Sequence, residues 1–246
     1  MYLLLSYQIH PLLAQDFVRV FLLMDTPLTA PPTTYVSLHI TVPQRLHEEV
    51  VITQSYFIEL ATSSNGKYFI KDTHYIVKSD LRLEKQTIVS MPGKLTVKGR
   101  FEIRDCQIEE IRSEIAVDGS FFISNCNQLK GIFGKIHTGK AFSIRGLKAI
   151  EEIACELKIT AQMDALGCEK LRSLAGSDIE VGTILILKFC KVLEELPQKT
   201  VIVGVCADLR GCSALEIENK GYTIRQGTGD TYQLSEVPKE LKLVRT

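Results

Sequence analysis

The chain has 246 residues, 45% of them hydrophobic, and its 29 basic and 29 acidic residues give a formal net charge of zero. A chain of this size and apolar content can bury a large core without a partner. Without surplus positive charge we expect no binding to nucleic acid or to an anionic membrane, and no apolar run reaches the roughly 18 residues of a membrane span.

Residues 1–49 are expected to form a cap. Pro11 suits the first turn of a helix, and apolar residues follow at helical spacing as far as Met24. We expect this helix to be a lid over the end of the following domain, with an amphipathic membrane or partner helix as the alternative. A Pro/Thr linker and an alternating strand at residues 35–42 follow. No basic residue precedes the apolar start, so no secretory signal is expected.

Residues 50–217 are expected to form a solenoid of stacked repeats. The repeat pattern is clear from residue 75 onward and degenerate between residues 50 and 61. Each clear repeat holds two apolar residues in alternation, then Cys or a substitute, then Leu and Ile at a spacing of three. The first apolar residue recurs every 20 to 22 residues, at Leu81, Phe101, Phe121, Phe142, Met163, Leu185 and Ala207. A unit this short cannot bury its apolar face alone, so the units must stack. Residues 63–74 are expected to be a surface loop, and residues 218–246 a C-terminal cap or tail.

Five of the seven cysteines occupy one position of the repeat, at Cys106, Cys126, Cys168, Cys190 and Cys212. We interpret them as small buried side chains whose S–H groups donate to loop carbonyls, rather than as a disulfide framework. A reducing compartment fits this usage. Cys155 and Cys206 lie outside the column, and Cys206 is expected to point outward. Five glycines that follow the I-x-V segment are expected to allow a tight bend, at Gly99, Gly119, Gly139, Gly182 and Gly204.

The units LTVKGRFEIRDC, IAVDGSFFISNC and LEELPQKTVIVG resemble the degenerate leucine-rich repeats of bacterial and phage proteins. The resemblance implies a parallel sheet with short helical or 3-10 turns on the convex side, and binding of a protein on the concave strand face. It also implies a bacterial setting, with a role as a host-directed virulence effector. The apolar residue of the general signature eight positions before Cys is missing, for example at Lys98 and Asp118. This departure leaves open a parallel β-helix with a second strand at I-x-V.

The outward side chains of the F-x-I strand are the candidate partner-binding residues. Large apolar side chains that alternate with core residues are uncommon on a solvent face without a use, and basic residues recur two positions before Cys. The residues expected to contact a partner are Arg104, Phe122, Arg145, Ile184, Ile186, Lys188, Phe189 and Arg210.

Nothing in the sequence indicates catalysis. The five His are scattered, and Asp164 and Asp208 share a column without a third group to support carboxylate chemistry. We therefore expect a monomeric, non-catalytic protein-binding module without cofactor or metal. It would be cytoplasmic, or secreted into a host cell without a classical signal peptide. The alternatives are a β-solenoid that binds or cleaves carbohydrate and a structural solenoid that self-assembles.

Overall fold

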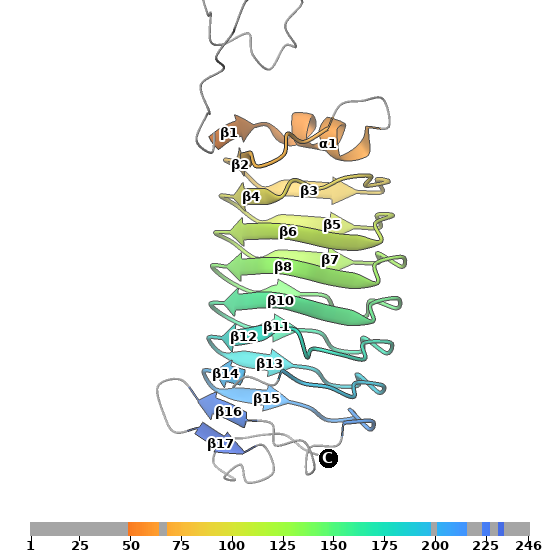
Figure 1. Ribbon diagram of the computed structural model, residues 1–246, viewed down its shortest axis with the longest axis vertical. Helices are drawn as coiled ribbons and strands as arrows, with labels where there is room; N and C mark the ends of the chain where they lie inside the picture. The colour runs from red at the N-terminus through yellow and green to blue at the C-terminus, as the bar shows by residue number, and fades with distance from the viewer. Residues whose placement is uncertain (1–48, 64–67, 198–200, 216–222, 227–230, 234–246) are drawn as a thin grey trace, which may run out of the picture. The chain divides into compact units, whose positions relative to one another are not determined.

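The computed structural model describes residues 49–63, 68–197, 201–215, 223–226 and 231–233. The helix expected before residue 25, the strand expected at residues 35–42 and most of the expected C-terminal cap lie outside these ranges. The described residues form a solenoid whose turns stack along one axis, as the repeat predicts (Figure 1). In the described part no helix is long and apolar enough to cross a membrane.

Each turn between residues 74 and 208 contributes a strand to each of two sheets, sheet A and sheet B. In spatial order, sheet A consists of β1 (Glu49–Ile52), β2 (His74–Val77), β4 (Lys94–Val97), β6 (Glu110–Val117), β8 (Gly131–Thr138), β10 (Glu152–Ile159), β12 (Asp178–Val181), β14 (Val201–Val203), β16 (Thr223–Gln226) and β17 (Thr231–Gln233). Sheet B consists of β3 (Leu81–Glu84), β5 (Phe101–Arg104), β7 (Phe121–Ser124), β9 (Phe142–Ser143), β11 (Met163–Asp164), β13 (Ile184–Ile186) and β15 (Cys206–Asp208). All described pairings are parallel except that of β16 with β17.

The second sheet decides between the two expected architectures. The I-x-V segment forms the strands of sheet A, as in the parallel β-helix alternative, and not the helical convex side of a leucine-rich repeat. The Cys-x-x-Leu segment makes only single turns, in which the Leu129 N–H donates to the Cys126 carbonyl at 3.2 Å. In the sequence, the missing apolar residue eight positions before Cys was the feature that indicated a β-helix. At Lys98 and Asp118 the chain has already left the strand, and both side chains are exposed.

The interior consists of equivalent side chains stacked on one another. Register pairs the first apolar residue of each sheet B strand with its counterpart, and Phe121 pairs with Phe101 on one side and with Phe142 on the other. The Phe101 and Phe121 rings are parallel with centroids 4.5 Å apart, and the Phe121 and Phe142 centroids are 5.4 Å apart. Met163 and Leu185 continue the column, also buried. The predicted interior column is therefore confirmed.

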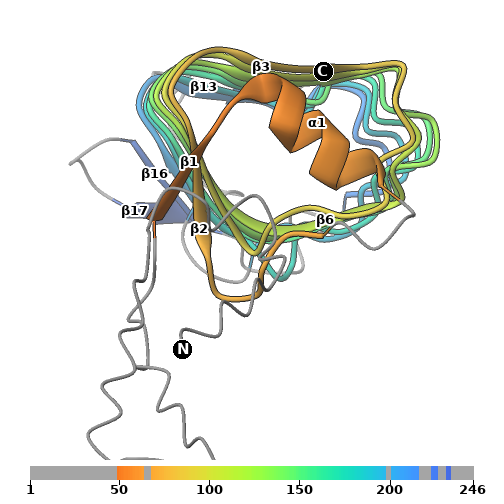
Figure 2. The same cartoon turned by 90° about the horizontal axis from the view of Figure 1, so that it is seen from above.

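A helix, α1 (Gln54–Thr62), crosses the open end of the stack (Figure 2). The degenerate repeat that begins at Val50 was expected to continue here as a further turn that includes Tyr56 and Ile58. That prediction is wrong beyond Ile52, where β1 ends. Beyond Ile52 the chain instead buries a helical face against the core, at Phe57, Leu60 and Ala61. The expected surface loop also contributes to the core, since the Phe69 ring packs between those of Phe57 and Tyr75.

The five glycines after I-x-V serve close packing between turns, and none of them has a positive φ. A Cβ on Gly119 would lie 2.7 Å from the Gly99 carbonyl oxygen, and one on Gly204 would collide with the Gly182 carbonyl. The expected tight bend is therefore not the reason for these glycines. At each of these glycines the preceding turn approaches so closely that a Cβ would overlap one of its atoms.

We predict that Gly119→Ala destabilises the solenoid, because the added methyl group must displace the backbone of the preceding turn. Overpacking of this kind costs about 1–3 kcal/mol. The measurement is the urea dependence of the circular dichroism signal. Gly93→Ala is the matched control, because nothing lies within 4 Å of the Cβ position there. Equal stability of the two variants would contradict this account of the corner.

Candidate functional site

The outward side chains of sheet B form two columns along the stack. The first column runs in strand register through Arg82, Glu102, Phe122, Ser143, Asp164, Ile186 and Asp208. The second consists of Glu84, Arg104, Ser124, Arg145, Leu166, Lys188 and Arg210. Backbone hydrogen bonds extend the ladder past the strand ends along this column, since Gly167 N–H donates to the Lys188 carbonyl and Phe189 N–H to the Arg210 carbonyl. The columns expected from the repeat are therefore present.

The predicted apolar anchors do not form one patch. Phe122 on β7 is separated from Ile186 on β13 by Ser143 and Asp164, which places the two residues about 14 Å apart at the usual strand spacing. Phe122 is half-buried, and the Arg100 guanidinium lies 5.4 Å from its ring centroid. Arg145 is exposed on the intervening turn of β9, and Arg104 is exposed on β5, in the turn before Phe122.

The other five predicted residues lie together at the C-terminal end of sheet B, and we call them the Phe189 patch: Ile184, Ile186, Lys188, Phe189 and Arg210. All but Phe189 are half-buried, and Phe189 is 46% exposed. The Lys188 Nζ lies 4.7 Å from the Phe189 ring centroid. The patch thus combines apolar surface with two cations, a composition typical of energetically dominant interface residues.

The basic column is less positive than its sequence suggests. Arg210 donates to both carboxylate oxygens of Asp208, at 2.9 and 2.7 Å, and this guanidinium holds the pKa of Asp208 below its ordinary value. Arg104 lies 3.5 Å from the Asp105 carboxylate. Among the described residues Arg145 and Lys188 form no ion pair, so they are the net cations of this face.

A left-handed corner precedes the cysteine position in every turn, a feature the repeat analysis missed. The corner residues are Lys85, Asp105, Asn125, Gly146, Gly167, Phe189 and Gly211, with φ between 53° and 75°. Gly, Asn and Asp adopt this conformation most easily, and they fill five of the seven corners. The recurrence of Gly, Asn or Asp immediately before Cys was the sequence feature from which these corners could have been predicted.

Lys85 and Phe189 are the two exceptions among these corners, and Phe189 has the bulkier side chain. A left-handed conformation costs a bulky side chain roughly 1–2 kcal/mol. Its φ is 63°, and the ring lies over Gly211, where a Cβ would come within 2.5 Å of the ring. Phe189 is thus both unfavourable for the backbone and partly exposed. The fold alone supplies no reason for an aromatic residue here.

The cysteine column is present as predicted, with four of its thiols buried and that of Cys212 half-buried. Each thiol donates to a carbonyl of the preceding turn: Cys106 to Leu83 at 3.4 Å, Cys126 to Ile103 at 3.8 Å, Cys168 to Ile144 at 3.1 Å, Cys190 to Ala165 at 3.3 Å and Cys212 to Leu187 at 3.0 Å. Burial raises the pKa of Cys126, Cys168 and Cys212 to about 11 and that of Cys155, buried on strand β10 of sheet A, to about 12. Thiolate chemistry is therefore disfavoured at these positions. Cys206 is half-buried on β15, on the outward side as expected.

The structure brings together no catalytic constellation in its described part. Asp164 and Asp208 are separated by Ile186, and each carboxylate accepts a local hydrogen bond, from Leu166 N–H and from Arg210 respectively. No group of three potential metal ligands occurs among the described residues. Comparison of the chain with models of known families, with curated proteins and with solved structures found no match.

The raised thiol pKa values predict that the protein loses stability above pH 9. In the unfolded chain a thiol ionises near its ordinary pKa of 9.0, whereas Cys155 in the folded chain keeps its proton up to about pH 12. The unfolded state therefore loses protons first, and the free energy of unfolding falls as pH rises through this window. Urea titrations at pH 7.5, 9 and 10.5 measure the fall. Cys155→Ala should show a smaller fall, and an unchanged pH dependence would contradict the assignment.

Proposed function

We propose that the protein is a non-catalytic protein-binding module whose docking surface is the outward face of sheet B, centred on the Phe189 patch. The observation that carries this proposal is Phe189 itself. Strained backbone that persists without a structural reason is typical of functional positions. A solvent-exposed aromatic ring beside the Lys188 ammonium group is the composition of an interface anchor.

The wider setting is part of the same proposal. We propose a monomer that binds its partner without cofactor, in the cytoplasm or, as a host-directed bacterial effector, inside a host cell. The resemblance of the repeat units to bacterial and phage repeats supports this setting. The charge of zero and the ion pairs on this face support a protein partner over nucleic acid, which requires surplus cations.

Phe189→Asn should separate binding from stability. Asn tolerates the left-handed conformation, so the free energy of unfolding should rise by up to about 1 kcal/mol. Capture of partner proteins by the immobilised chain should be lost in the same variant. Pull-downs from bacterial and eukaryotic lysates, quantified by mass spectrometry, measure capture. Urea unfolding measures stability.

The matched control for Phe189→Asn is Asn125→Phe, which places the same ring at an equivalent corner. This variant should lose stability by roughly 1–2 kcal/mol and keep its capture. Retained capture in Phe189→Asn would contradict the proposed centre of the docking surface.

The double variant Phe122→Ser/Ile186→Ser tests the face as a whole. Both side chains are half-buried on the outward side, so we expect a small loss of stability but loss of capture. The control is Thr96→Ala on the outer face of sheet A. A large loss of stability in the double variant would show that these side chains belong to the core.

A further inference from the structure

One segment of sheet A has an open edge. β6 pairs with β8 along its whole length, from Glu110 to Val117, but with β4 only from Glu114 onward. The preceding turn passes this place as the irregular segment 88–93 rather than as a strand. Residues 110–113 therefore have no neighbouring strand on this side within the described structure.

The open edge presents backbone groups that lack a strand partner. Glu114 N–H donates to the Gly93 carbonyl at 2.8 Å, toward the preceding turn. Backbone groups alternate sides along a strand, so Arg112, two residues earlier, directs its N–H and C=O to the same side. No strand of the described part lies there to pair with them.

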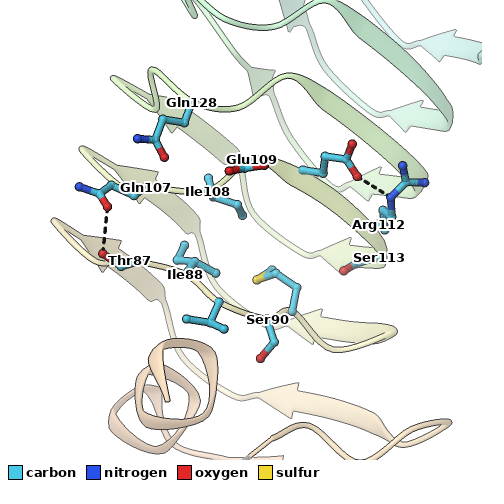
Figure 3. A pocket seen from close by; sticks show the side chains of 12 residues that line it. Thr87, Ile88, Ser90, Gln107, Ile108, Glu109, Arg112, Ser113 and Gln128 are labelled. Atoms are coloured by element: carbon cyan, nitrogen blue, oxygen red, sulfur yellow. Dashed lines mark hydrogen bonds and ion pairs between the residues drawn. The ribbon is translucent and has the colours of Figure 1, made fainter. Parts of the chain in front are cut away.

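A pocket of about 480 Å³ occupies the place of the missing strand (Figure 3). Ile88, Ile108 and Met91 supply its apolar wall. Ser113 also lines it, and the Ser113 hydroxyl is buried without a hydrogen-bond partner in the described structure. Buried hydroxyls are rarely left unpaired, so this group departs from the usual pairing at the wall of the pocket.

The charge of the pocket is negative. Its lining contains two carboxylates, Glu109 and Glu110, and one cation, Arg112. The Arg112 Nε already pairs with Glu110 at 2.6 Å, and its guanidinium lies 4.1 Å from the Phe133 ring centroid. Glu109 is exposed and forms no ion pair among the described residues. A ligand that carries a positive charge is therefore favoured.

We propose that this pocket binds an extended, basic peptide segment of a partner protein, which adds a short strand to the edge of β6. Residues 110–113 span about 13 Å, enough to pair with about four residues of such a segment. Its backbone would pair with Arg112, one apolar side chain would contact the wall at Ile88 and Ile108, and a Lys or Arg would approach Glu109. The site is separate from the Phe189 patch and does not rest on the function proposed for sheet B.

The probe is a fluorescent, acetylated hexapeptide of alternating valine and lysine, titrated with the full chain and followed by anisotropy. We expect saturable binding. The same peptide with N-methyl groups on the backbone amides of one edge should bind at least tenfold more weakly. A valine–glutamate peptide should also bind more weakly, and Glu109→Lys should reverse this preference.

Two variants of one residue separate the backbone of Arg112 from its side chain. Arg112→Pro removes the N–H on the open edge, where proline is tolerated, and should abolish binding. Arg112→Ala keeps the N–H and should retain it. If Arg112→Pro lowers the melting temperature, the relative affinity of the wild-type chain for the methylated and unmethylated peptides decides whether the backbone of the peptide pairs with β6.

Three outcomes would overturn the proposal. Equal affinity for the methylated peptide would mean that the pocket holds side chains without strand addition. A dimer in light scattering that Arg112→Pro abolishes would identify a second copy of the chain as the occupant. Slow hydrogen exchange of the Arg112 amide in the free protein would show that the edge is already paired within the chain.

Discussion

The spacing between parallel strands, about 4.8 Å, governs the structure of this protein. Along the paired strands each residue lies directly against its counterpart in the next turn, so each such position must be compatible with a copy of itself at that distance. Aromatic rings meet this condition by stacking, as Phe101 and Phe121 do. Thiols meet it by donating to the carbonyl of the turn before. At the corner of Gly119 the backbones come closer than a side chain allows, and only glycine fits.

The same condition explains which features the sequence predicts. Self-stacking makes buried columns periodic, so the period, the interior column through Phe121 and the cysteine column were all predictable. The number of sheets was not, because an I-x-V segment suits either a second strand or the return of a leucine-rich repeat. The Lys98 and Asp118 positions carried the deciding information, but only as a departure from a pattern.

The ends of the stack and its local irregularities follow other rules. At α1 the alternating pattern of β1 is lost, and Phe57 and Leu60 cover the core from a helix instead. The open edge at residues 110–113 depends on the length of the turn before it, which no residue of β6 reveals. The sequence correctly predicted that the candidate binding residues of sheet B face outward. That Phe122 lies apart from the Phe189 patch could be seen only from the strand order and the strand spacing of the structure.

The two candidate surfaces depart from self-stacking in different ways. At the Phe189 patch one corner carries a side chain that its backbone conformation disfavours, and the neighbouring turn accommodates it with Gly211. At the β6 edge one turn is irregular where its successors form strands. In both places the departure is confined to a single turn, while the ladder on either side continues.

The reversal of direction at β17 limits the length of this architecture. β17 runs antiparallel to β16, so a further turn in the direction of β16 would pair with β17 in antiparallel register, in which equivalent repeat positions no longer lie next to one another. The columns of equivalent side chains that stabilise the stack would therefore end there. Lengthening the array by duplicating a repeat would therefore succeed in the interior of the stack but not beyond β17.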